Sequence, residues 1–361
     1  MYIKQIRLEQ FRNLLDQEIE FDPGINILTG NNAQGKTNII EAIWLFSACK
    51  SFRTNNEKDF IFYQANHADL DLLFYKNNRF QSASFRYYER KKREMYLNEI
   101  KVKPSELIGN FLSVLFFPEH LNLVKEGPDV RRKFLDFAIC QVKPRYFALL
   151  SEYNKTLYQR NNVLKSEEES ILKTLDVWDE KLAVLGTEIF LFRKKYVQML
   201  HQYGAEVIDE MTQGRETLCV EYKSFTLESD DRNWIQQQLL NKIRNSREKD
   251  LRYGYTNEGP HKDDLELSLN GRSAKAFGSQ GQQRSCVMAL KLAEAEILND
   301  FYDEYPVLLF DDVFSELDQE RKNYIIQKIK EKQVIITACE QIQDFSGARL
   351  FEIDHGEVKV L

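Results

Sequence analysis

The chain has 361 residues, a formal net charge of −6 at pH 7, and 43% hydrophobic and 29% charged residues. These proportions are those of ordinary globular proteins and exclude collagen-like, disordered and membrane-embedded chains. The length predicts two domains, or one domain that carries a large insertion. The acidic balance argues against a general polyanion binder but leaves room for a local basic surface, because affinity for nucleic acid depends on the phosphates neutralised at the contact.

The cysteines and the N-terminal residues indicate a reducing compartment. Five cysteines are scattered along the chain, and none forms a CxxC pair or a Cys/His cluster with metal-ligand spacing. The first residues are charged and alternating, unlike a signal peptide. The longest apolar run, at 111–117, is far shorter than the about 20 residues that span a bilayer. We therefore expect a cytoplasmic protein without membrane contact.

The N-terminal part of the chain is expected to form a sheet. Residues 2–29 alternate between apolar and polar positions, which predicts two strands that lead into a glycine-containing loop. Residues 69–103 continue as short strand-like segments separated by charged turns. The most basic turn, "ERKKR" at 89–93, is either a solvated hairpin tip or a contact for DNA phosphates.

Helical spacing begins near Pro128, a residue suited to a first helical turn. Segments 129–142 and 145–164 both show this spacing, and a longer apolar stripe then predicts one helix of about eight turns. We interpret the stripe as packing surface rather than as a ligand site. Its members are Trp178, Leu182, Leu185, Ile189, Phe192, Tyr196, Met199, Tyr203 and Val207.

Strand and loop character returns near residue 250. A Gly/Ser/Gln loop, a helix at 282–302, a buried strand at 306–310, another helix and a final strand at 333–339 follow. The order of sheet, helical block and sheet predicts an α/β domain with an insertion. We expect its N-terminal half at 1–115, a mainly helical insertion at 116–248, and its C-terminal half at 249–361.

The loop "GNNAQGKT" at 30–37 fits the pattern GxxxxGK[ST] between a strand and a helix. In such a loop the backbone N–H groups point at phosphate oxygens, Lys36 adds positive charge at the β and γ phosphates, and Thr37 ligates Mg²⁺. The glycines allow the backbone to close around the phosphates. We therefore predict a site for ATP and Mg²⁺, with Lys36 also in a catalytic role. The nucleotide-binding candidates here are Arg12, Gly30, Asn31, Asn32, Ala33, Gln34, Gly35, Lys36, Thr37 and Asn38.

Two acidic residues follow the apolar strand near residue 308. Asp311 and Asp312 should emerge at the edge of the sheet where the phosphates lie. We predict that Asp311 holds Mg²⁺ and that Asp312 orients the attacking water. An exposed turn is the alternative reading of two neighbouring acids after a strand.

A third motif separates the classes of ATPase. Ser279, Gln280 and Gly281 precede a helix and resemble the signature loop of the ABC-type ATPases. In that class the loop offers a serine hydroxyl and a helix N-terminus to the γ-phosphate held by a second subunit. The segment "SELD" at 315–318 resembles the D-loop that crosses the same interface. A plain surface loop is the alternative.

These motifs and others resemble the RecF family of bacterial recombination-repair ATPases, which is related to the heads of the structural-maintenance-of-chromosomes proteins. The resembling stretches include "LEQFRNL" (8–14), "KSFRT" (50–54), "YGYTNEGPHKDDL" (253–265) and "LLFDDVFSELD" (308–318). With the phosphate and signature loops they stand in the family's order and cover nearly the whole chain.

The resemblance implies a fold and a function. It implies an ABC-type P-loop ATPase head, a mixed sheet with flanking helices, that carries a mainly helical second lobe. It also implies an ATP-dependent homodimer that binds single-stranded DNA and gaps or junctions. In the family this dimer cooperates with the RecR and RecO mediators and helps to load the RecA recombinase, in replication, recombinational repair and SOS induction.

The chain departs from the family and from ABC transporters at two places. Lys262 stands in "GPHKDD" where the family has arginine, which removes a bidentate guanidinium contact. Asp312 and the segment 337–340 stand where transporter subunits have a glutamate and a switch histidine, so that His261 or no residue substitutes. We expect a weak, DNA-stimulated ATPase whose slow hydrolysis acts as a timer.

The leading hypothesis is a DNA clamp that ATP closes and hydrolysis opens. The candidate DNA contacts are Arg90, Lys91, Lys92, Arg93, Arg131, Arg132 and Lys133. Residues 131–133 belong equally well to a salt-bridge network between the lobes.

Three other classes of protein are alternatives to the DNA clamp. A transporter motor would place its signature loop much nearer the phosphate loop, whereas Ser279 follows Lys36 by 243 positions. A chromosome-organising protein would need a far longer coiled coil. A nucleotide switch that does not hydrolyse ATP stays open, although the two carboxylates argue mildly against it.

Overall fold

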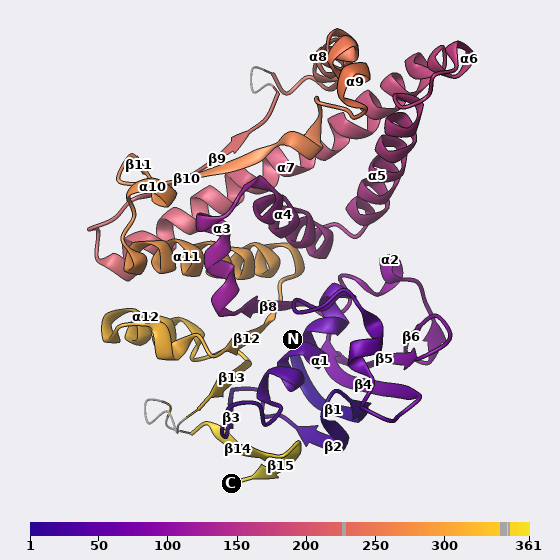
Figure 1. Cartoon of the computed structure of the whole chain (residues 1–361). Helices are drawn as coiled ribbons and strands as arrows, with labels where there is room; N and C mark the ends of the chain where they lie inside the picture. Colours follow the sequence, from indigo (N-terminus) through magenta and orange to yellow (C-terminus); the bar gives the residue numbers. More distant parts are fainter. Residues whose placement is uncertain (226–228, 340–344, 346) are drawn as a thin grey trace. The chain divides into compact units, whose positions relative to one another are not determined.

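The computed structural model describes residues 1–225, 229–339, 345 and 347–361, which form two compact units (Figure 1). The first, which we call the sheet unit, consists of residues 1–121, 207–215 and 287–361. The second, which we call the helical unit, consists of residues 122–206 and 216–286. Each unit is therefore assembled from segments that are distant in the sequence. The domain boundaries expected after residues 115 and 248 remain predictions.

One sheet of the sheet unit is antiparallel throughout, in the order β2-β1-β4-β5-β6-β7. Buried and partly exposed residues alternate along β4 and β5, as expected when one face packs on a core. The two strands are joined by Asn77 and Asn78, which both have positive φ and so match the twist of a tight hairpin. The strands are β1 (Tyr2–Phe11), β2 (Leu14–Glu20), β4 (His67–Lys76), β5 (Arg79–Tyr88), β6 (Glu94–Leu97) and β7 (Ile100–Lys101).

The other sheet is mostly parallel, in the order β15-β14-β3-β13-β12-β8. Every pair is parallel except β14 with β15. These two strands follow β13, so the prediction that the strand at 333–339 is the final one is wrong. The central strands are short apolar runs buried on both faces, the usual pattern of parallel sheets. The strands are β3 (Ile25–Thr29), β8 (Ser113–Phe116), β12 (Val307–Asp311), β13 (Val334–Ala338), β14 (Arg349–Asp354) and β15 (Glu357–Val360).

Helix α1 (Lys36–Ala48) lies between these two sheets, in contact with β4 on one side and with β8, β12 and β13 on the other. Nearly all of its residues are buried, which is what an apolar helix surrounded by core requires. Its first residue is also the first after the glycine that closes the phosphate loop. The start of α1 is thus fixed against the parallel sheet.

The rest of the sheet unit is helical or consists of short turns. Its further elements are η1 (Glu57–Phe60), α2 (Pro104–Leu107), η2 (Pro118–Leu121), η4 (Phe314–Glu316), α12 (Gln319–Ile329) and the parts of α7 and α11 that fall within its residues. No helix among the described residues is both long and apolar enough to cross a membrane.

The helical unit contains helices and one small sheet in the order β11-β10-β9. Its long helix α7 (Leu175–Thr212) has 38 residues and includes the whole predicted stripe, so it is longer than the expected eight turns. The sequence analysis did not anticipate β9, which lies within the block expected to be mainly helical. The elements are α3 (Asn122–Lys125), α4 (Pro128–Val142), α5 (Arg145–Val163), α6 (Glu169–Leu172), β9 (Leu218–Lys223), α8 (Arg232–Asn245), α9 (Arg247–Tyr253), η3 (Pro260–Lys262), β10 (Asp264–Leu269), β11 (Arg272–Ser273), α10 (Ala274–Phe277) and the start of α11 (Gln280–Tyr302).

Candidate nucleotide-binding site

Three parallel strands of the sheet unit end at one edge of their sheet. β3 runs into the loop at 30–35, β12 ends at Asp311, and β13 lies between them. Thr337 of β13 is in register with Asp311 on one side and with Leu28 on the other. Because carboxyl ends of parallel strands share an edge, residues from both ends of the sequence meet there.

The phosphate loop needs glycine at its first position for a steric reason. Gly30 has φ +144°, and a Cβ there would lie 2.2 Å from the backbone oxygen of Ile353. Gly35, at φ +123°, is closely faced by Asn13, whose oxygen would lie 3.0 Å from an added Cβ. The loop is thus packed against β14 and against the turn that follows β1. These contacts fix the backbone whose N–H groups are expected to meet phosphate.

The Lys36 side chain is buried within the loop. Its ammonium donates to the backbone oxygens of Gly30, at 2.6 Å, and Asn31, at 2.8 Å. This brings a positive charge into the curve of the loop. Such a position is the one that the sequence motif requires of the lysine.

Thr37 and Asp311 are in direct contact across 274 residues of sequence. The Thr37 hydroxyl donates to Asp311 Oδ1 at 2.9 Å, and the Thr337 hydroxyl donates to the same oxygen at 2.8 Å. Burial raises the pKa of the Asp311 carboxyl, while the hydrogen bonds from Thr337 and Thr37 act in the opposite direction. A hydroxyl and a carboxylate side by side are oxygen ligands of the kind that Mg²⁺ takes beside a nucleotide, so the residues present fit that ion.

Asp312 lies at the same edge but differs from Asp311 in its environment. It is exposed and has positive φ, and its backbone N–H donates to the Thr337 hydroxyl at 2.9 Å. Ser315 donates to its backbone oxygen. The two acids are therefore placed differently, one buried against Thr37 and one turned toward solvent. Of the segment 337–340 that replaces the switch histidine, Glu340 lies outside the described residues.

Other residues brace the loop without being nucleotide candidates in the sequence analysis. Asn13 donates to the backbone oxygen of Gln34 at 2.9 Å and accepts from Asn38 at 2.7 Å. The backbone N–H of Gly356 donates to the same Gln34 oxygen. Asn31, Asn32 and Ala33 are exposed at the tip of the loop.

Arg12 is held by a buried carboxylate at the face of α1. Its guanidinium donates to both oxygens of Glu41, at 3.0 and 2.8 Å, and lies over the Phe60 ring. Arg53, which the sequence analysis did not single out, donates to Asn38 at 2.6 Å and pairs with Glu41. Its stretch, "KSFRT", was noted only as a family resemblance. Thr337 was noted only as part of the segment 337–340, and Glu41 carried no motif of its own.

The signature residues begin α11 in the helical unit. The Ser279 N–H donates to Gln282 Oε1, and the Gln282 N–H donates back to the Ser279 hydroxyl oxygen. This reciprocal pair is a capping box, which fixes the helix start. Ser279 and Gln280 are exposed, and Gly281 is partly exposed. The exposed N-terminus of a long helix is suited to meet an anion.

The predicted DNA contacts divide into two groups. Arg90 is 92% exposed at the turn between β5 and β6, beside the exposed Lys91 and Lys92. Arg93 instead donates to the backbone oxygen of Cys49 and pairs with Glu57 at 2.8 Å. Three cations of the turn are therefore exposed to solvent, whereas Arg93 is engaged in contacts within the sheet unit.

Arg131 and Arg132 are engaged inside the helical unit. Arg131 makes a bidentate pair with Asp264, at 2.7 and 2.9 Å, and is buried. Arg132 donates to the backbone oxygen of Asp263 and pairs with Asp129. These contacts support the prediction that the two arginines belong to a salt-bridge network, but this network lies within the helical unit. Lys133 is exposed.

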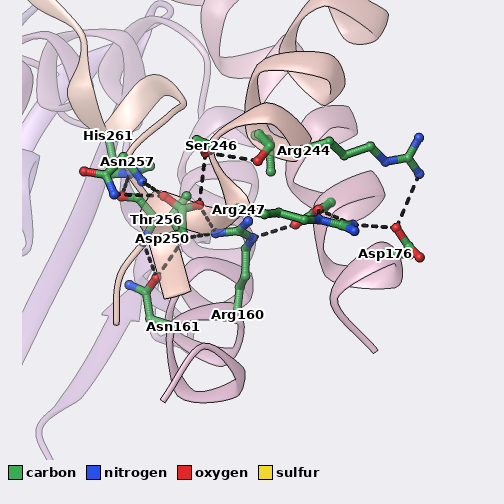
Figure 2. A network of polar contacts seen from close by, with 12 residues as sticks. Arg160, Asn161, Asp176, Arg244, Ser246, Arg247, Asp250, Thr256, Asn257 and His261 are labelled. Atoms are coloured by element: carbon green, nitrogen blue, oxygen red, sulfur yellow. Dashed lines mark hydrogen bonds and ion pairs between the residues drawn. The ribbon is translucent and has the colours of Figure 1, made fainter. Parts of the chain in front are cut away.

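His261 has both ring nitrogens occupied in the helical unit, beside the network drawn in Figure 2. Nε2 lies 3.0 Å from the Thr256 carbonyl oxygen, which can only accept, so Nε2 carries the proton. The Tyr153 hydroxyl then donates to Nδ1 at 2.8 Å. Burial is the main cause that lowers the pKa of His261 to about 4. These contacts make it a neutral packing histidine.

Comparison with known proteins agrees with this geometry. The family model described as "RecF/RecN/SMC N terminal domain" matches residues 2–359. A curated relative from Clostridium perfringens, "DNA replication and repair protein RecF", is 38% identical over an alignment of 365 positions that covers 99% of this chain and 100% of the relative.

Two solved structures are similar over the full chain. One, described as the recombination mediator protein RecF-ATPrS in the RecFOR pathway, has a TM-score of 0.93 and 36% identity, and the match covers 100% of this chain and 98% of that one. A second, described as RecF-ATP in the same pathway, has a TM-score of 0.91 and 37% identity, with 100% and 99% covered. The predicted resemblance and the predicted fold class, an ABC-type head with a mixed sheet and flanking helices, are confirmed. The chain therefore belongs to the RecF/RecN/SMC N-terminal domain family and, within it, to the RecF proteins.

Proposed function

We propose that this protein is an ATP-dependent DNA-binding protein of replication, recombinational repair and SOS induction, acting in the cytoplasm. It binds single-stranded DNA and gaps or junctions as an ATP-closed homodimer, and with RecR- and RecO-type mediators it helps to load the RecA recombinase. The observation that carries the proposal is the contact between Thr37 and Asp311 beside the buried Lys36. A full-chain relative is named for DNA replication and repair, and solved relatives are described with ATP.

The chemistry assigns roles to this chain's own groups. Lys36 and the N–H groups of the loop bind the phosphates of ATP, and Thr37 and Asp311 would hold Mg²⁺, which neutralises phosphate charge when bound. Asp312 orients the attacking water from the exposed side of the same edge. A short, exposed carboxylate in this role suits slow, DNA-stimulated hydrolysis that ends the bound state.

The homodimer completes the site in this proposal. Ser279 accepts from Gln282 and keeps its own O–H to donate, so it can bond to a γ-phosphate held by a second copy of the chain. ATP then stabilises the dimer by mass action, and hydrolysis releases it. The cations at 90–92 and Lys133 are exposed and are candidates for the DNA surface. Arg93, Arg131 and Arg132 have weaker support because they are paired and are buried or partly buried.

Dimerisation tests the shared site. Ser279→Arg should weaken ATP-dependent dimerisation at least about tenfold in analytical ultracentrifugation, since a hydrogen bond to a charged group contributes about 1.5–3 kcal/mol. Binding of ATP to the monomer should persist in this variant, whereas Lys36→Ala should lose it. Dimerisation equal to that of the unmodified protein would overturn the shared site.

Two further measurements separate the clamp from a non-hydrolysing switch. Phosphate release, with and without DNA, reports whether ATP is cleaved. Binding to gapped, single-stranded and duplex DNA across a salt series reports how many phosphates are engaged. A protein that binds DNA with ATP but releases no phosphate would be the switch.

A further inference from the structure

Three large apolar or aromatic side chains lie exposed within five residues of the helical unit. Tyr253, at the end of α9, is 53% exposed, and Tyr255 is 43% exposed in the turn that follows. Leu251 is exposed beside them. The two tyrosine rings lie 5.9 Å apart between centroids and are inclined by 32°. Such a pair presents flat apolar area to solvent.

Cations surround this pair of rings. The Arg252 guanidinium lies 5.8 Å from the Tyr253 centroid, and the Lys262 ammonium lies 5.1 Å from the Tyr255 centroid. Lys165 passes close to Gly254, where an added Cβ would lie 3.3 Å from its Cγ. We call Lys165, Arg252, Tyr253, Tyr255 and Lys262 the tyrosine patch. It combines π faces with three positive charges.

A buried polar network, drawn in Figure 2, joins Asp250 and Asn257, which flank the two tyrosines in the sequence. Asp250, fully buried, accepts from Arg160 at 2.7 Å and from Ser246 with one carboxylate oxygen. Its other oxygen accepts from the backbone and side-chain N–H groups of Asn257, at 3.0 and 2.8 Å. Arg160, also fully buried, donates to Asp179 at 2.6 Å.

This network fixes the backbone that carries the tyrosines. The Gly254 N–H donates to the Asp250 carbonyl at 2.8 Å, and Gly254 adopts φ 71°, a left-handed helix end that favours glycine. On the other side of Tyr255, the Thr256 N–H donates to Asn161 at 2.8 Å. Because buried charges carry a large desolvation cost, their presence here points to positioning rather than to stability alone. The rings are thus held in place before any ligand arrives, which reduces the entropy lost on binding.

We propose that the tyrosine patch is a stacking site for unpaired bases of single-stranded DNA. Bases of any sequence offer a π face to an aromatic ring, and the neighbouring cations suit the phosphates that link them. Duplex DNA keeps its bases stacked on each other and cannot use these faces. The proposal rests on the proposed DNA-binding function and deepens it, because it assigns the recognition of single strands to named residues.

The test compares single-stranded and duplex DNA with the full chain and ATP. An oligodeoxythymidylate that contains one 2-aminopurine reports stacking through quenching of its fluorescence. In Tyr253→Ala/Tyr255→Ala the affinity for the single strand should fall about 5- to 150-fold per stacked base and the quenching should disappear. The affinity for a duplex of equal length should stay unchanged.

Matched variants distinguish stacking from general damage. Tyr253→Phe/Tyr255→Phe keeps the rings and should keep both affinity and quenching. Tyr63→Ala, which removes a tyrosine that is 81% exposed in the sheet unit, should have no effect. Lys262→Gln should lower the salt dependence of single-strand binding by about 0.7 in slope if its phosphate contact is lost.

The outcomes separate this inference from the proposed function. If the unmodified protein binds single strands with ATP and the double alanine variant binds them equally well, the patch is not a stacking site, and a protein partner is the better occupant. If the unmodified protein binds no DNA in any form, both proposals are overturned.

Discussion

Removal of the Asp250 carboxylate should destabilise the helical unit far more than removal of Asp176, although both pair with arginine. Asp250 is fully buried, and Asp250→Ala leaves Arg160 with a buried charge that keeps its contacts to Asp179 and Thr256 but loses this carboxylate. Asp176 is mostly exposed where it pairs with Arg247. The comparison therefore separates a buried ion pair from a solvated one.

The expected magnitude follows from these contacts. Breaking one partner of a buried ion pair costs about 3–5 kcal/mol, because the remaining charge keeps its desolvation penalty. The Asn257 backbone N–H also loses its acceptor, whereas the Ser246 hydroxyl and the Asn257 side-chain amide keep the carbonyl oxygens of Ile243 and Tyr255 as acceptors. Costs within one network do not add, so the same range stands as the prediction. A loss of this size is a large part of the about 5–15 kcal/mol that holds a typical protein folded. Asp176→Ala should leave stability nearly unchanged.

Urea unfolding followed by circular dichroism gives the global effect, and hydrogen exchange of peptides that cover 246–257 gives the local one. Asp250→Ala should lower the unfolding midpoint and the protection of the Asn257 amide, which bonds to the Asp250 carboxylate. Arg160→Met/Asp250→Asn, which removes both charges, should lose less stability than Asp250→Ala alone. The reasoning is refuted if Asp250→Ala and Asp176→Ala shift the midpoint equally.

Two further predictions concern the nucleotide site. Asp311→Asn should abolish Mg²⁺-dependent ATP hydrolysis yet raise the melting temperature of the nucleotide-free protein at neutral pH. Burial raises the folded-state pKa of Asp311, so its ionisation at neutral pH lowers the stability of the folded chain. This loss of stability fades as the pH falls through that pKa toward 3.8, the ordinary value for aspartate. Melting curves from pH 4 to 8 check this, and a lower melting temperature at pH 7 would contradict it. Gly30→Ala should destabilise the protein by about 1–3 kcal/mol or more and weaken ATP binding, because its Cβ meets the Ile353 backbone oxygen in a conformation that only glycine adopts readily. Calorimetric titration with ATP checks it against Gly24→Ala, where no atom lies within 4 Å of the new Cβ.

The nucleotide-binding edge of the parallel sheet could be predicted because each of its motifs is a short continuous stretch of sequence. A strand, a glycine loop and a helix in succession predict where Lys36 and Thr37 lie, and a second apolar strand predicts that Asp311 reaches the same edge. The contact of Thr337 with Asp311 was missed because a threonine near the end of a strand carries no pattern that marks it. Arg53 and Glu41 were missed because the pairing of Glu41 with Arg12 and with Arg53 depends on how a loop returns to the face of α1.

Long-range pairing of strands and side chains explains two of the remaining differences between the predicted and the observed structure. Strand β9 is stabilised by pairing with β10, which begins about 40 residues later, so the residues of β9 alone are weak evidence for a strand. The sequence left Arg131 open between a DNA contact and a salt bridge because its partner, Asp264, is 133 positions away. Helix α7 is longer than the predicted stripe because the apolar repeat continues at both ends, with Leu175 three residues before Trp178 and Met211 four residues after Val207, both buried. For β9 and Arg131, by contrast, the decisive neighbour is absent from the local sequence.

The position of β3 has a consequence for how the chain is made. Its two hydrogen-bonded neighbours, β13 and β14, begin more than 300 residues after β3 ends, so a ribosome exposes β3 long before either can pair with it. Until those two strands are made, both edges of that apolar strand lack their partners, which is a state prone to aggregation and suited to chaperones. The phosphate loop that follows β3 therefore has its supporting strands only after β13 and β14 have been synthesised.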